Sequence, residues 1–165
     1  MIKSIKNFLD KDEHKTLTSL FIGNTLPWYF HDYKVIKNDN LFQFTHTFVN
    51  EYVVSSNFYN WLNPIINKLQ PRSIRRIKAN LTFKSSKIEK NLFHTDFVDS
   101  EENLKNMKTA IYYLNSNNGC TFFEKNKKEL STENKMIIFP SNLKHAGTTH
   151  TDSLQRIVLN FNYYI

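Results

Sequence analysis

Residues 108–124, KTAIYYLNSNNGCTFFE, form the stretch that decides the fold class. Aromatic and β-branched residues favour one strand over 108–115 and another over 120–124, and Asn117-Asn118-Gly119 between them is a strong turn signal. By the same signs, further short strands are expected at 74–83, 91–97, 135–139, 144–149 and 154–164. Strands of this length at this spacing are typical of a β-sandwich or barrel.

The N-terminal half has a different pattern, which predicts helices packed on the outside of this core. Asp10-Lys11-Asp12-Glu13 is a capping box that opens a helix to about Phe21, with Gly23 just past its end. Apolar residues at helical spacing predict a second helix over 57–69, which Pro64 would kink or restart. Strands are favoured at 28–36 and 41–53. We therefore expect a single α+β, mainly β domain over residues 1–165, in which 1–72 supports a jelly-roll core at 73–165.

Length and composition exclude several protein classes. A chain of 165 residues, 40% hydrophobic and 15% aromatic, can bury a real core, and three glycines and four prolines exclude collagen-like and low-complexity chains. The single cysteine, Cys120, excludes an intramolecular disulfide and a zinc site built on several thiolates. No apolar window is long enough to span a bilayer, and the first residues lack the apolar region of a secretory signal. A cytoplasmic protein with no membrane partner is expected.

The positive charge of the chain is a weak sign of a nucleic-acid partner. The formal net charge is +7, but 18 of the 22 basic residues are lysines spread through a chain rich in Asn and Ile. Such a compositional bias raises the isoelectric point without building a binding face. Nucleic acid is therefore an alternative partner and not the favoured one.

His94-Thr95-Asp96 carries the most informative chemistry in the sequence. In a strand, side chains at i and i+2 point to the same face, so one imidazole and one carboxylate would project together. A second imidazole from a distant strand would complete a 2-His-1-carboxylate triad, the ligand set that suits non-haem Fe(II). His145 is the candidate third ligand, because it follows the apolar strand MIIFP and precedes Ala146-Gly147, where the backbone could approach a metal closely.

Arg156 follows His145 by eleven residues and is the only arginine in the C-terminal half. It lies in the otherwise apolar stretch LQRIVLNFNYY, where an arginine is costly unless its guanidinium meets a buried anion. The planar guanidinium suits a carboxylate held through two hydrogen bonds. Metal ligands followed by such an arginine indicate a small dicarboxylate lying between iron and Arg156.

A second His-Thr-Asp sequence, at 150–152, competes with the first. No later histidine exists to complete a triad with it. If His150 replaced His145 as the distal ligand, only six residues would lead to Arg156, which leaves little room for a turn and a strand in register. We therefore predict a polar turn at 150–152. The histidines of the N-terminal half are predicted to be surface or strand residues, with His46 also a candidate substrate contact: His14, His31 and His46.

The order of His94-Thr95-Asp96, His145 and Arg156 resembles that in the Fe(II)- and 2-oxoglutarate-dependent oxygenases, which fold as a double-stranded β-helix. The strand that ends in Tyr-Leu-Asn and leads through a glycine turn to the next strand resembles the prolyl 4-hydroxylase branch, including small phage members. The resemblance covers residues 73–165. It implies that His94, Asp96 and His145 bind Fe(II) and that Arg156 binds the 5-carboxylate of 2-oxoglutarate.

The resemblance also implies further cosubstrate contacts. Tyr113 corresponds to the tyrosine that hydrogen-bonds the same carboxylate in prolyl hydroxylases, and strand parity places Thr109 on its face of the strand. Asn80, in Asn-Leu-Thr, is similar to the asparagine of an Asn-x-Tyr motif, with Thr82 in place of the tyrosine. The sequence departs from the family pattern at Val158, where some members have serine, and at Gly119, which stands alone in place of Gly-Gly.

The activity implied by the resemblance is a dioxygenase reaction. Fe(II), 2-oxoglutarate and O2 would hydroxylate a C–H bond with release of succinate and CO2, with ascorbate as a candidate reductant. The expected substrate is a prolyl residue of a peptide or protein, or a prolyl-like small molecule, in the host cytoplasm if the protein is phage-encoded.

Two other functions compete with this one. A nucleic-acid base demethylase or hydroxylase could use the basic charge and the aromatic stretch Trp28-Tyr29-Phe30. A non-catalytic jelly-roll protein could keep the metal site for stability. The polar segments 85–92 and 99–107 flank the predicted iron site and are candidate mobile lids.

Overall fold

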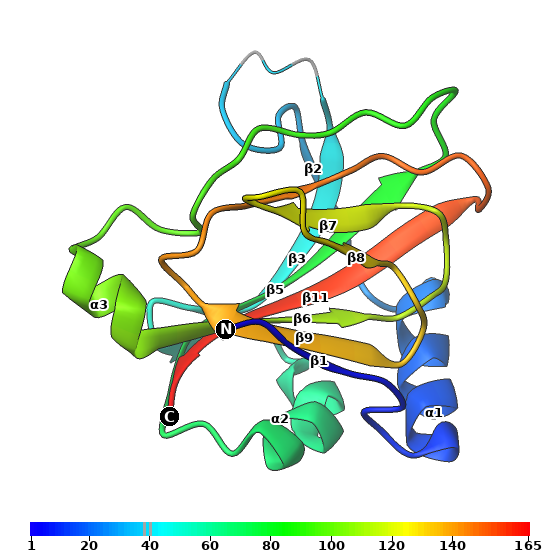
Figure 1. The fold of residues 1–165 in the computed structure, drawn as a ribbon. Coiled ribbons are helices and arrows are strands. Elements are labelled where there is room, and N and C mark those ends of the chain that lie inside the picture. The colour runs from blue at the N-terminus through cyan, green and yellow to red at the C-terminus, as the bar shows by residue number, and fades with distance from the viewer. Residues whose placement is uncertain (38, 40) are drawn as a thin grey trace.

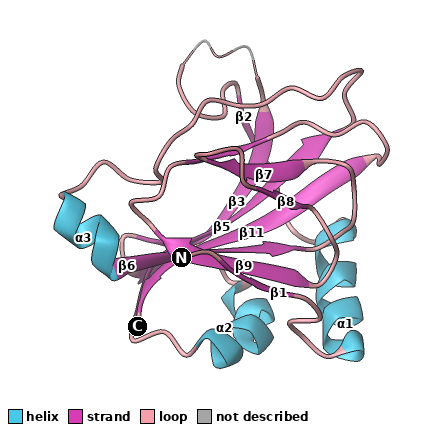
Figure 2. Cartoon of the chain, viewed as in Figure 1, coloured by secondary structure: helices cyan, strands magenta, loops and turns pink. Residues whose placement is uncertain are grey.

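The computed structural model describes residues 1–37, 39 and 41–165. Antiparallel strands form two sheets (Figures 1 and 2), the larger in the order β1-β9-β6-β11-β5-β3-β2 with β4 paired to β3, and the smaller in the order β10-β7-β8. The strands of the larger sheet are β1 (Lys3–Ile5), β2 (Tyr29–His31), β3 (Gln43–Asn50), β4 (Val53–Val54), β5 (Ser73–Phe83), β6 (Met107–Tyr113), β9 (Lys135–Pro140) and β11 (Gln155–Tyr164). Those of the smaller sheet are β7 (Cys120–Phe123), β8 (Lys128–Leu130) and β10 (His145–Gly147).

Helices cover one face of the larger sheet, and the smaller sheet faces the other (Figure 1). The helices are α1 (Lys11–Ile22), the 3-10 helix η1 (Tyr59–Leu62), α2 (Asn63–Leu69) and, at the opposite end, α3 (Glu101–Asn106). Leu17, Phe21 and Ile65 of α1 and α2 belong to the same buried cluster as Leu159 and Phe161 of β11. Burying this apolar face is the main stabilising contribution that the helices make.

The inner face of the larger sheet is apolar at one side and polar at the other. Ile111, Phe139 and Val158 form a second buried cluster with Phe123 of the smaller sheet. On the central strands, the alternate positions that share this face carry polar and charged side chains: Arg76, Lys78, Asn80 and Thr82 of β5, and Arg156, Asn160 and Asn162 of β11. A polar strip inside a sandwich marks the place of the site.

Most of the predicted elements are confirmed. α1 begins after Asp10 with the predicted capping box, in which the Asp10 backbone N–H donates to the Glu13 carboxylate at 3.2 Å. The predicted helix at 57–69 is divided into η1 and α2, and Pro64 lies in the first turn of α2, where its missing N–H costs nothing.

Four expectations about elements are wrong or incomplete. Residues 91–97 form no strand and contain one isolated bridge, at His94, next to another at Lys90. The predicted strand at 28–36 is reduced to β2. The turn at 117–119 connects the two sheets and not a hairpin, since β6 and β7 do not pair. The short elements β1, β8 and α3 were not expected, because three to six residues are too few to show a periodicity.

Within the described ranges, no helix has both the length and the apolar character needed to cross a membrane.

Candidate active site

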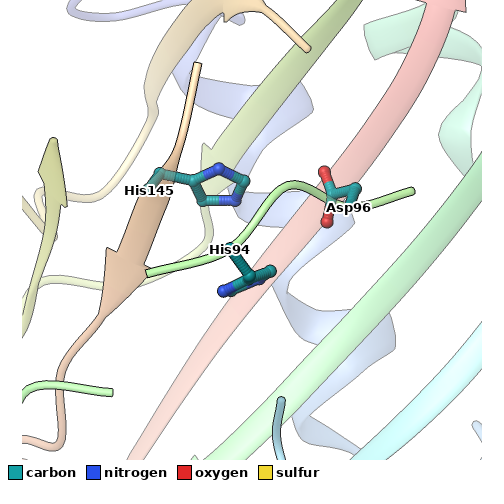
Figure 3. A group of neighbouring side chains, drawn as sticks. All are labelled: His94, Asp96 and His145. Carbon is teal, nitrogen blue, oxygen red and sulfur yellow. The ribbon is translucent and has the colours of Figure 1, made fainter. Parts of the chain in front are cut away.

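His94, Asp96 and His145 point toward a common space between the two sheets (Figure 3). One donor atom from each side chain lies within 4.8 Å of those of the other two, and the described residues contain no other such group of His, Cys, Asp or Glu. Ligands about 2.1 Å from one ion can lie up to about 4.2 Å apart, so small side-chain rotations would bring the three onto a single metal ion. Two imidazoles and one carboxylate are the donor set that Fe(II) accepts in such sites.

Backbone pairing brings the two histidines together from distant parts of the chain. The N–H of each donates to the carbonyl of the other at 3.0 Å, and the ring centroids are 4.8 Å apart. His145 is the first residue of β10 and is buried, whereas His94 lies on an irregular segment. The predicted convergence of the three side chains is therefore observed, although strand parity does not produce it.

The Asp96 carboxylate is held against three neighbouring strands of the larger sheet. Arg76 of β5 forms an ion pair with it at 2.9 Å, and the amides of Asn160 and Asn162 of β11 donate to it at 3.2 and 2.8 Å. The Thr109 hydroxyl of β6 lies 3.5 Å away. Arg76, Asn162 and Thr109 are cross-strand neighbours, so a single row of the sheet orients this ligand.

Electrostatics keep Asp96 ionised. Burial alone would raise its pKa, but the Arg76 guanidinium, the His145 and His94 imidazoles and the Asn162 hydrogen bond outweigh burial and hold the pKa well below the usual range. Burial lowers the pKa of His145, which favours the neutral imidazole. An ionised carboxylate and a neutral imidazole are the forms that bind a metal ion.

Replacing Arg76 with methionine is expected to destabilise the metal-free protein by about 3 kcal/mol at pH 7, because Asp96 becomes a buried, unpaired carboxylate. In the wild type, Asp96 has a lower pKa folded than unfolded, so it stabilises the fold above its unfolded pKa of about 3.9. In the variant, burial dominates and raises the pKa of Asp96 in the folded protein. The cost of burying an unpaired carboxylate therefore disappears as the Asp96 carboxyl group becomes protonated. The difference in unfolding free energy should therefore narrow as the pH falls from 7 to 4 in urea titrations.

Arg75→Met is the matched control for this experiment. Arg75 pairs with Glu51 and Asp99, both more exposed than Asp96, so its loss should cost less than about 1 kcal/mol. An Arg76→Met deficit that stays constant between pH 7 and pH 4 would show that the ion pair does not control the ionisation of Asp96.

Arg156 lies in the same pocket, farther along β11 from the metal-ligand group. Its side chain is buried, and its Nε donates to the Ser131 hydroxyl at 2.8 Å. No carboxylate of the described residues forms an ion pair with it, so its remaining N–H groups are available to a ligand. A buried guanidinium without a counter-ion fits the carboxylate of a bound dicarboxylate.

The other residues predicted to contact the cosubstrate occupy different places in this pocket. Asn80 lines it, opposite Val158 on the neighbouring strand. Tyr113 is fully buried, shares the inner face of β6 with Ile111, and donates its hydroxyl to Thr121, which lines the pocket. Thr109 lies at the other end, where its hydroxyl contacts Asp96 and Ser141. Its position is that of a residue that orients a metal ligand, and not that of a direct cosubstrate contact.

The absence of a side chain at Gly119 leaves space for the side chain of Arg156. A Cβ atom at Gly119 would lie 2.8 Å from Asn117 Oδ1, 3.2 Å from Arg156 Cδ and 3.2 Å from the Thr149 carbonyl oxygen. Gly119→Ala is therefore expected to displace Arg156, to destabilise the protein by about 1–3 kcal/mol and to weaken dicarboxylate binding about tenfold. Thermal unfolding and a 2-oxoglutarate titration measure the two effects.

Gly23→Ala is the control, since its added Cβ would meet only the Ser19 carbonyl oxygen, at an ordinary 3.5 Å. Unchanged 2-oxoglutarate affinity in Gly119→Ala would mean that this glycine does not set the position of Arg156.

Several residues of the site were not predicted. Lys34 and Lys78 line the pocket, as do Asn91, Asn160 and Thr121. Strand parity with Arg156 could have identified Asn160 and Asn162, because all three share one face of β11. No sequence signal distinguished Lys34 and Lys78 from the other lysines.

Three predictions about histidines need correction or comment. His46 faces the helices and not the site, with its ring nitrogens 2.7 Å from the Pro27 carbonyl oxygen and the Ser56 hydroxyl, so it is not a substrate contact. His14 is half-buried on α1, 2.7 Å from the Tyr112 hydroxyl, and is not a free surface residue. Residues 150–152 do form a bend between strands, as expected, and lie outside the metal-ligand group, but His150 itself is fully buried.

The clustered arginines that could have favoured nucleic acid are engaged within the protein. Arg75 and Arg76 both lie over the Phe97 ring, at 4.0 and 4.5 Å from its centroid, and both form ion pairs. Asp99 and Ser100 lie at the start of the segment predicted as a lid. Asp99 forms an ion pair with Arg75, and the Ser100 side chain caps the short helix α3. These contacts tie the start of that segment to Arg75 and to α3.

Comparisons with protein families and with curated proteins find no match to the sequence. Several solved structures are similar to the fold of this chain. A 2OG-Fe(II) oxygenase family oxidoreductase from Burkholderia pseudomallei is 14% identical, with a TM-score of 0.67 over 99% of this chain and 84% of that one. A viral collagen prolyl hydroxylase from Paramecium Bursaria Chlorella virus-1, in complex with 2OG, is 16% identical, with a TM-score of 0.67 over 99% and 96% of the two chains.

A third similar structure is a prolyl hydroxylase in complex with a hypoxia inducible factor peptide fragment, from Trichoplax adhaerens. It is 11% identical, with a TM-score of 0.65 over 99% of this chain and 82% of that one. At such identities the likeness concerns the architecture. The chain has the double-stranded β-helix fold of the 2OG-Fe(II) oxygenases and prolyl hydroxylases.

Proposed function

We propose that this protein is an Fe(II)- and 2-oxoglutarate-dependent oxygenase that hydroxylates a prolyl group. The observation that carries the proposal is the presence, in one pocket, of a 2-His-1-carboxylate group and a buried arginine that has no counter-ion among the described residues. A metal site kept only for stability would need the first feature but not the second. The fold and the order of the motifs along the chain support the same conclusion.

The residues divide into those that would hold the metal and those that would hold the cosubstrate. His94, Asp96 and His145 would bind Fe(II), which supplies O2 activation coupled to the conversion of 2-oxoglutarate to succinate and CO2. Arg156 would bind the 5-carboxylate. Tyr113 would act there through its hydrogen bond to Thr121, and Asn80 would line the wall.

Protein groups around the metal ligands have a positioning role. Arg76, Asn162 and Thr109 hold the Asp96 carboxylate close to the orientation in which its oxygen would meet the ion. The apolar walls formed by Ile111 and Val158 exclude water from the space between the metal and Arg156. No general base is required for this chemistry.

The prolyl specificity rests on likeness. The Tyr-Tyr-Leu-Asn strand resembles that of prolyl hydroxylases, and prolyl hydroxylases are among the structures of the same fold. Nothing in the arginine cluster favours a nucleic-acid substrate, because Arg75 and Arg76 are already paired.

An anaerobic titration with Fe(II) and 2-oxoglutarate tests the cofactor assignment. Wild-type protein should develop the visible charge-transfer band of metal-chelated 2-oxoglutarate. Succinate release with proline-containing compounds, compared with the same compounds carrying alanine, then tests the substrate. Absence of the band in folded protein would contradict the oxygenase assignment, and a band without any proline-stimulated turnover would contradict the prolyl assignment alone.

A further inference from the structure

Lys78 lies on the inner face of β5, at the metal end of the pocket. Its cross-strand neighbour on β11 is Asn160, whose amide donates to Asp96 at 3.2 Å. Lys78 lines the pocket together with His94, Asp96 and His145. The ammonium group therefore belongs to the wall beside the metal ligands, a place that neither metal binding nor the 5-carboxylate contact requires.

The Lys78 ammonium has no partner among the residues that the structure describes: it makes no ion pair and no hydrogen bond there. Among the described residues, Asp96 is the one carboxylate that lines the pocket, and Arg76 already engages it at 2.9 Å. Burial, followed by the nearby charge of Arg76, lowers the pKa of Lys78 to about 8. A largely buried cation of this kind costs free energy until an anion joins it.

The charges of the filled site leave Lys78 available. Fe(II) and Arg156 together would carry three positive charges against the two negative charges of 2-oxoglutarate, and Asp96 is paired with Arg76, so this count leaves no anion for Lys78. Arg156 lies four residues from Asn160 on β11, which is about 13 Å along the strand, so it serves the far carboxylate of the cosubstrate. Lys78 lines the near end of the pocket, with His94, Asp96 and His145.

We propose that Lys78 binds a carboxylate of the primary substrate. On the proposed function of the site, this makes the substrate free proline or a C-terminal prolyl residue, in which a carboxylate lies next to the ring that reacts, and not a prolyl residue inside a peptide. An ammonium–carboxylate pair in a partly desolvated pocket would orient the prolyl ring and would favour substrates that carry the carboxylate over those that lack it.

A binding measurement tests this without turnover. Protein with lysine labelled by ¹³C at Cε is saturated with Zn(II) and 2-oxoglutarate, and acetate or acetamide is added at equal ionic strength. The Lys78 resonance, assigned by its absence from Lys78→Met, should shift in a saturable manner with acetate and stay in place with acetamide. No shift with acetate would overturn the proposal, whether or not the protein is an oxygenase.

The cosubstrate is the other source of a carboxylate, and a second arm separates it. If Lys78 binds the substrate, the 2-oxoglutarate concentration that gives half of the maximal charge-transfer absorbance should change less than about threefold in Lys78→Met. A weakening of tenfold or more would assign Lys78 to the cosubstrate and overturn the proposal. Thermal unfolding confirms that the variant is folded, and its melting temperature should rise, because a buried charge is removed.

Turnover with matched ligands gives the third arm. Succinate release should be stimulated by L-proline or glycyl-L-proline at least tenfold more, in kcat/KM, than by glycyl-L-prolinamide, which lacks the carboxylate. Lys78→Met should lose this preference, and Lys78→Arg should keep part of it. A wild-type enzyme that prefers the amide, or an internal prolyl peptide, would refute the assignment while leaving the oxygenase activity established.

Discussion

Replacing Asp96 with alanine is expected to abolish the charge-transfer band and all oxygenase turnover. The change removes the only carboxylate of the metal-ligand group and leaves the Arg76 guanidinium, formerly 2.9 Å from it, without its partner and beside the metal position. Breaking a buried pair of this kind costs about 3–5 kcal/mol of unfolding free energy. Because one of the three metal ligands is lost and an unpaired cation stays beside the metal position, the metal affinity should fall at least about 10²-fold. Fe(II) binding followed by calorimetry under anaerobic conditions measures the loss directly.

Asp152→Ala is the matched control, because Asp152 ends the second His-Thr-Asp sequence of the chain. Its carboxylate accepts a hydrogen bond from the Asn118 N–H at 3.0 Å and lies outside the metal-ligand group. Metal affinity should therefore be unchanged in Asp152→Ala. Equal losses of metal affinity in Asp96→Ala and Asp152→Ala would contradict the assignment of the metal ligands to the first His-Thr-Asp sequence.

Arg156→Met is expected to weaken 2-oxoglutarate binding about 10²-fold and to leave metal binding intact. The guanidinium is buried, has Ser131 as its hydrogen-bond partner and lacks a counter-ion among the described residues, so its contact with a carboxylate is a desolvated one. Truncating one partner of a buried charge pair costs about 2–5 kcal/mol. The dependence of the charge-transfer band on 2-oxoglutarate concentration gives the affinity of each protein.

Arg72→Met controls for the loss of one positive charge, since Arg72 is exposed and lies outside the pocket lining. Arg156→Lys should recover little affinity, because one ammonium group cannot reproduce the paired N–H donors of arginine. Wild-type affinity in Arg156→Met would place the far carboxylate elsewhere in the pocket.

Strand periodicity explains what could be predicted from the sequence. Residues of β6 and β11 alternate between the helix-covered face and the inner face, so parity alone correctly grouped Tyr113 with Ile111 and placed Tyr112 on the other side. The same rule explains the error over His46, whose position on β3 turns it toward the helices.

Long-range contacts explain what could not be predicted. His94 and Asp96 converge with His145 from an irregular segment, and no local pattern encodes such a segment because tertiary hydrogen bonds hold it. Asn162 and Lys78 matter through their neighbours on other strands, and each is one of many residues of its type in the chain. Chemistry that depends on rare residues, such as the lone Arg156 of the C-terminal half, is visible in the sequence, whereas chemistry built from common ones is not.

The bridge between His94 and His145 has a consequence for the whole protein. These residues are 51 positions apart in the chain, and their backbones already exchange two hydrogen bonds. A metal ion bound to both imidazoles and to Asp96 closes a long loop of the polypeptide, as a cross-link would, and disfavours the unfolded chain by restricting it. The ion that would serve the chemistry would thus also link the irregular segment to both sheets. The free energy of unfolding should therefore rise with the concentration of the metal ion.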